Sequence, residues 1–90
     1  MTIFAIMAPP DSPDLQRFVA ALDRVFAGNY RMVGNGQYLA ARRDLTSGQV
    51  AEMMGIHGEV GQFVVVTSAG WGGWHQNSVW EWLRIQETAS

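Results

Sequence analysis

Residues 30–42 read YRMVGNGQYLAAR and have the pattern of a β-hairpin. Two strand-like runs with apolar and aromatic side chains flank Gly34-Asn35-Gly36. Asn-Gly between such runs is the strongest short-range signal for a β-hairpin, because both central residues of a type I′ turn need a positive φ. The stretch therefore predicts two antiparallel strands, over residues 30–33 and 37–42, joined by a type I′ turn.

A helix is predicted on each side of this hairpin. Before it, residues 12–14 (Ser-Pro-Asp) are a typical helix start, and Gly28 suits the position just after the last turn. After it, Thr46 and Gln49 form a capping-box pattern, and Gly55 is placed to end the helix. The first helix carries one apolar stripe at helical spacing: Leu15, Phe18, Val19, Leu22, Val25 and Phe26.

One strand near the start of the sequence and one after the second helix complete the order. Residues 2–8 and 62–67 are short apolar runs, the second rich in β-branched side chains. The sequence therefore predicts an α+β fold of βαββαβ order, a ferredoxin-like sandwich. It has a four-stranded antiparallel sheet, with the first and third strands in the centre and two helices on one face.

The C-terminal part is rich in tryptophan. A second capping-box pattern, Ser78 with Glu81, predicts a short terminal helix that ends near Ile85. We expect a ferredoxin-like domain over residues 1–70. Residues 71–90 then form a tryptophan-rich segment that packs on the same domain or on a partner subunit.

The predicted sheet has more apolar surface than two helices on one face can cover. In the last strand, Phe63 and Val65 point to one face and Val64 and Val66 to the other. A one-sided antiparallel sheet should instead alternate apolar and polar residues. The second face therefore needs a cover, either the tryptophan-rich segment or another subunit, and we expect a homodimer.

Composition narrows the classes of function. Apolar residues make up 48% of the chain, charged residues only 16%, and the net charge is −2. This balance is unlike that of proteins with a dense basic surface for nucleic acid. The chain has no cysteine, which excludes disulfides and thiolate chemistry. No signal-peptide pattern or membrane-length apolar run is present, so a cytoplasmic protein is expected.

Three features of the chain together resemble the SinR-like small proteins. They are the opening strand at residues 3–8, the stretch from Gly36 to Val50 with its Asp-Leu-Thr before a helix, and the strand at 62–67 followed by a Gly/Trp turn and Trp82-Leu83. That group is distantly related to the CRISPR-adaptation small subunit and to ferredoxin-fold ribonuclease toxins. The resemblance implies a ferredoxin-like fold, dimerisation through the sheet and a C-terminal segment that crosses to the partner.

The chain departs from the nuclease members of this group at the metal site. Those relatives place a metal-binding Asp directly after the first strand, whereas this chain has Ala8-Pro9-Pro10 there and its first acid is Asp11. Asp11 and Asp14 could hold Mg²⁺ or Mn²⁺ at a dimer axis, but acids are also favoured at a helix N-terminus. The departure weakens the expectation of ribonuclease activity.

A second set of candidates concerns nucleic acid. Arg31, Arg42 and Arg43 lie on the predicted hairpin and could form a patch that meets phosphates, with Tyr38 stacking on a base. Strand alternation is expected to place Arg31 and Arg42 on a shared face, away from Met32 and Leu39. Ordinary surface charge explains the same residues. His57 and His75 have no metal-ligand spacing and are expected to be turn or surface residues.

The tryptophans are the most unusual feature of the composition. Tryptophan is enriched at the energetic centres of protein interfaces, which favours an interface over a ligand platform. The predicted interface residues are Phe63, Val65, Trp71, Trp74, Trp80 and Trp82.

Taken together, these features predict a non-catalytic, dimeric protein that acts through protein–protein contacts, with no cofactor. The alternatives are a metal-dependent ribonuclease or nucleic-acid-binding toxin, and a small-molecule binder with tryptophans in its pocket wall.

Overall fold

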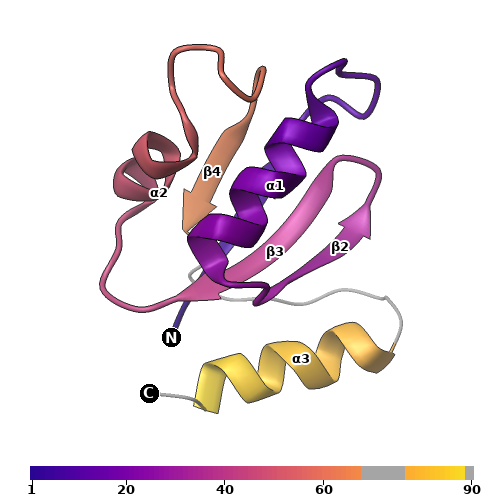
Figure 1. Ribbon diagram of the computed structural model, residues 1–90. Helices are drawn as coiled ribbons and strands as arrows, with labels where there is room; N and C mark the ends of the chain where they lie inside the picture. Colours follow the sequence, from indigo (N-terminus) through magenta and orange to yellow (C-terminus); the bar gives the residue numbers. More distant parts are fainter. Residues whose placement is uncertain (68–76, 89–90) are drawn as a thin grey trace.

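A computed structural model describes residues 1–67 and 77–88 (Figure 1). The fold is α+β with a four-stranded antiparallel sheet, as the sequence predicts. The elements follow in the order β1 (Thr2–Met7), α1 (Leu15–Phe26), β2 (Tyr30–Gly34), β3 (Gln37–Arg42), α2 (Ser47–Met54), β4 (Val64–Thr67) and α3 (Asn77–Thr88).

The strands of the sheet lie in the order β2-β3-β1-β4. β1 pairs antiparallel with both β3 and β4, so that Phe4 lies opposite Ala40 on one side and Thr67 on the other. β1 and β3 therefore form the centre of the sheet, and β2 and β4 form its edges.

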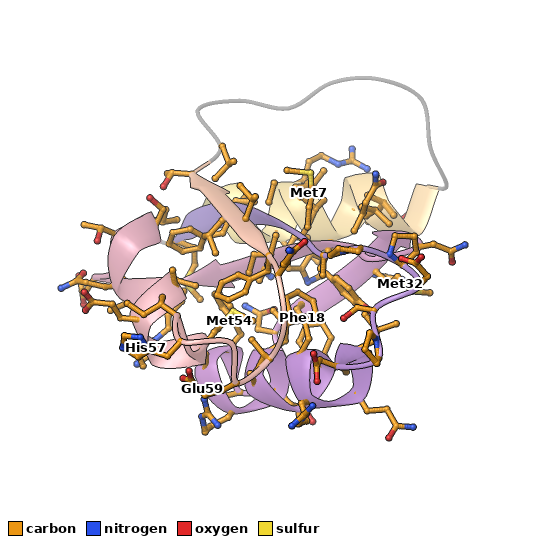
Figure 2. The ribbon with its side chains drawn as sticks, turned by 90° about the horizontal axis from the view of Figure 1, so that it is seen from above. Met7, Phe18, Met32, Met54, His57 and Glu59 are labelled. Atoms are coloured by element: carbon orange, nitrogen blue, oxygen red, sulfur yellow. The ribbon has the colours of Figure 1, made fainter. Side chains whose placement is uncertain are left out.

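The main core lies between the sheet and the pair of helices α1 and α2. Phe4 and Ile6 of β1 are fully buried against this pair, together with Phe18 and Leu22 of α1. Figure 2 shows Phe18 and Met54 between the sheet and these helices. The apolar stripe of α1 thus covers the face of β1 that carries its even-numbered residues.

The helix α3 covers part of the opposite face. Its residues Val79 and Leu83 are 4% and 1% exposed and pack with Ile3 of β1 and Ala41 of β3. Figure 2 shows α3 on the side of the sheet opposite α1, so the sheet is the middle layer of three.

A polar contact also holds α3 in place. Asn29, just before β2, donates from Nδ2 to Oε1 of Gln86 at 2.9 Å, and Gln86 is itself buried. A buried amide needs such a partner, because an unpaired one costs about 1–3 kcal/mol. The contact therefore favours one position of α3 on the sheet.

The helix ends differ in part from the predictions. The capping box of α2 is confirmed: Gln49 N–H donates to Thr46 Oγ1 at 3.1 Å, and Thr46 N–H donates to Gln49 Oε1 at 2.9 Å. The helix α1 begins at Leu15, later than predicted, because Ser12 Oγ accepts the Asp14 N–H in a turn ahead of the helix. The predicted cap at Ser78 is wrong, since α3 begins at Asn77 and Ser78 lies inside it.

The hairpin is confirmed, but its turn type is not. Gly36 has φ 71°, whereas Asn35 does not have the positive φ that a type I′ turn requires. The register also shifts between Met32 and Gly34, which marks an irregularity in β2. Gly36 is held against the residues after β1, since its carbonyl oxygen accepts the N–H of Ala8 at 2.7 Å.

Substitution of Gly36 by alanine should destabilise the protein severely. A Cβ at Gly36 would lie 2.1 Å from the carbonyl oxygen of Ala8, in addition to the cost of its positive φ. We expect Gly36→Ala to lower the free energy of unfolding in urea by about 3 kcal/mol or more. The control is Gly58→Ala, which has φ 86° and open space around the new Cβ, and it should cost only about 1 kcal/mol. Equal losses in the two variants would contradict the close approach at Ala8.

The packing of α3 can be tested with two residues of the same helix. Leu83 is 1% exposed and Ile85 is 61% exposed. We expect Leu83→Ala to lower the free energy of unfolding by about 2–4 kcal/mol, because it leaves a cavity between α3 and the sheet. Ile85→Ala should change it by less than about 0.5 kcal/mol. A Leu83→Ala protein as stable as the Ile85→Ala control would show that α3 does not pack on this face.

Candidate interaction surface

Within residues 1–67 and 77–88, one part of the sheet face shared with α3 is left uncovered. Met7, Val64 and Val66 are 41%, 56% and 45% exposed, and we call these three residues the open face. In the register of the sheet Met7 lies opposite Val64, and Val66 lies opposite Ala5, so the three side chains are neighbours. Figure 2 shows Met7 on the same side of the sheet as α3. The open face is therefore a contiguous apolar patch.

The strand β4 forms one edge of the sheet, and its outer side pairs with no strand in the described part of the chain. Its sequence is Val-Val-Val-Thr. Edge strands are usually protected from further pairing by a charge, a proline or a bulge. β4 contains neither a charged residue nor a proline, so its edge is suited to pair with another extended chain.

Two predicted interface residues, Phe63 and Val65, point toward the main core and away from the open face. Both are partly buried against the main core, and the Phe63 ring centroid lies 6.0 Å from that of Phe18. Alternation along the strand places Val64 and Val66 on the opposite, open face. An interface role for Phe63 and Val65 stays a prediction. The exposed apolar residues of β4 are their neighbours, Val64 and Val66. The alternation of the sequence already indicates that these two valines point to the other face.

The tryptophans are only partly described. Trp82 is partly buried and packs against the cluster formed by Ile3, Ala41, Val79 and Leu83 within its own chain. Trp71, Trp74 and His75 lie outside the described residues, as does the side chain of Trp80.

The predicted nucleic-acid patch is not assembled as expected. Arg31 lies opposite Leu39 in the register, on the α3 side of the sheet, whereas Arg42 Nη1 donates to the carbonyl oxygen of Val25 in α1 at 2.6 Å. The two arginines are thus on opposite faces, and the shared face predicted for them is wrong. Arg43 is exposed directly after β3.

Tyr38 is buried and unavailable for stacking on a base. It is only 6% exposed, and its ring centroid lies 5.6 Å from that of Phe18 and 6.1 Å from that of Tyr30. Its ring faces are therefore used within the core.

Desolvation raises the pKa of the Tyr30 phenol above 10.0, and the nearby Asp23 carboxylate raises it further. Tyr30 consequently stays protonated near neutral pH.

The acidic candidates lie in the loop before α1. Asp11 is exposed and lines a pocket of about 320 Å³ with Pro9, Asp14 and Gly61. The Asp14 carboxylate pairs with the Arg17 guanidinium. Within residues 1–67 and 77–88, no group of three histidine or acidic side chains is arranged to hold a metal ion. His57 is exposed in the loop after α2 (Figure 2).

A groove that the sequence analysis did not find lies between α2 and β4. It has a volume of about 600 Å³, and none of the ten described residues that line it is ionisable. Gly48 and Ala51 form its wall on α2, and Val65 of β4 forms the opposite wall with Phe63, which directly precedes this strand. Ile56 lies between the two walls in sequence. The signal that could have revealed it is the run of small residues on one side of α2, which leaves space beside the edge of the sheet.

Comparison of the chain with protein-family models, with curated proteins and with solved structures found no match. The helices among the described residues are all too short or too polar to cross a membrane.

The structural role of Arg42 is open to a direct test. Its guanidinium satisfies a carbonyl oxygen in the last turn of α1, where the helix itself supplies no donor. We expect Arg42→Ala to lower the free energy of unfolding by about 1.5–3 kcal/mol. The control is Arg17→Ala, which removes an exposed ion pair and should cost less than about 1 kcal/mol. A stable Arg42→Ala protein would return this arginine to the set of candidate phosphate contacts.

Proposed function

We propose that this chain is a non-catalytic protein-interaction domain that forms a homodimer through the open face. The observation that carries the proposal is the exposure of Met7, Val64 and Val66 beside an unprotected edge strand. Burial of a whole valine side chain stabilises by about 1.5–3 kcal/mol, so covering these half-exposed side chains favours association.

The proposed fold class is the ferredoxin-like sandwich. The central position of β1 and β3 and the packing of α1 and α2 on one face support it, with α3 as an addition on the other face. Membership of the SinR-like group is likewise a proposal, based on the sequence features that it shares with this chain.

The size of the open face sets its role in a dimer. A stable interface buries about 800 Å² on each partner, which is more than three side chains provide. We therefore place the open face at the centre of the interface, where a few well-packed apolar residues supply most of the binding energy. The exposed surface of α3 adjoins it and would complete the contact.

The second candidate, a metal-dependent ribonuclease or nucleic-acid-binding protein that uses Asp11 with Mg²⁺ or Mn²⁺, has less support. The neighbouring Asp14 is engaged by Arg17, and Arg31 and Arg42 lie on opposite faces of the sheet. No arrangement of these residues favours it over the interaction domain.

A charge on the open face should abolish dimerisation. Val64 is 56% exposed, so Val64→Lys is tolerated in the single chain but would bury an ammonium group in the interface. We expect wild type to have the mass of a dimer in multi-angle light scattering and Val64→Lys that of a monomer. The control is Met32→Lys on the other edge strand, at a residue 62% exposed, and it should remain a dimer. A monomeric wild type at high micromolar concentration would overturn the proposal.

A further inference from the structure

The groove between α2 and β4 has an uncharged lining, and this limits what can occupy it. The acidic residues of α2 and its following loop, Glu52 and Glu59, line the separate gap between α1 and α2 together with Arg17 and Arg24. A charged group in the groove would lose its hydration without gaining a partner of opposite charge. The matching ligand is therefore an uncharged segment.

The groove also borders the open edge of β4. Figure 1 shows α2 beside β4, at the margin of the sheet. A further strand would lie about 4.8 Å from β4, which places it along the groove. Its main chain could take up the outward N–H and carbonyl groups of Val64–Thr67.

The walls of the groove provide both contact and room. Val65 of β4 and Phe63, just before the strand, line it from alternate positions of the chain, which is the spacing at which an added strand presents its own side chains. On α2, Gly48 and Ala51 are small, and a Cβ built at Gly48 has only Thr46 Oγ1 near it, at 3.9 Å. The volume of about 600 Å³ is within the range of ligand sites.

We propose that this groove binds an extended, uncharged peptide segment of a partner protein, which adds to the sheet as a fifth strand beside β4. The inference rests on the proposed function as an interaction domain and names the class of partner. The peptide uses the groove and the edge of β4, whereas the dimer uses the open face.

The test is a selection from a displayed library of short random peptides on wild-type protein, followed by fluorescence anisotropy with the enriched peptides. The blocking variant is Gly48→Leu, whose side chain fills the groove and whose helical backbone accepts it without strain. We expect it to weaken binding by about tenfold or more. The matched control is Glu52→Leu, which adds an apolar side chain on the same helix but beside α1, and it should bind as wild type does.

A second probe tests the main-chain contacts. Peptides methylated on alternate backbone nitrogens lose the N–H groups that pair with β4, and we expect their affinity to fall by about tenfold or more. Failure to enrich any uncharged peptide, equal binding to Gly48→Leu, or no effect of methylation would each overturn the inference.

Light scattering on the same variants separates this inference from the proposed function. A dimer that binds no peptide overturns the inference alone, and a monomer that binds peptide overturns the dimer alone. If Gly48→Leu converts a wild-type dimer to a monomer, the occupant of the groove is a second copy of this chain, and the peptide partner is overturned.

Discussion

The structure depends on the burial of β1 from both sides. Ile3 and Phe4 are consecutive residues that point to opposite faces, yet both are at most 7% exposed. A strand with this pattern is stable only where each face is covered, and here α1 and α2 cover one face and α3 the other. Among the described residues, α3 reaches only part of its face, and the remaining part is the open face. The candidate interaction surface is thus a direct result of how the central strand is packed.

Much of the architecture could be predicted from local sequence signals. The hairpin after residue 30, the capping box of Thr46 and the end of α2 at Gly55 depend on contacts between residues close in sequence, and all three are present. The sequence also predicted that the second face of the sheet needs a cover, and α3 covers part of that face. What the sequence could not give is how much of that face α3 covers, because this depends on long-range contacts such as that of Asn29 with Gln86.

The errors have a common physical origin. The side of the sheet to which a strand residue points depends on strand register, and the irregularity between Met32 and Gly34 alters it. The faces of Arg31 and Arg42 were therefore misjudged. The turn type was also wrong, because Asn35 does not adopt the positive φ of a type I′ turn although Gly36 does. The groove beside α2 was not predicted, because its wall on α2 consists of small residues. Small residues form no hydrophobic periodicity that would indicate a groove.

The central position of β1 also has a consequence for synthesis of the chain. β1 leaves the ribosome before β3, and β3 before β4, although β1 needs both as neighbours. Until β3 has emerged, its apolar side chains consequently have no sheet to join. Exposed apolar segments of this kind are where nascent chains aggregate or recruit chaperones. The yield of folded protein in a cell should therefore depend on how well this first strand is shielded until Val64–Thr67 has emerged.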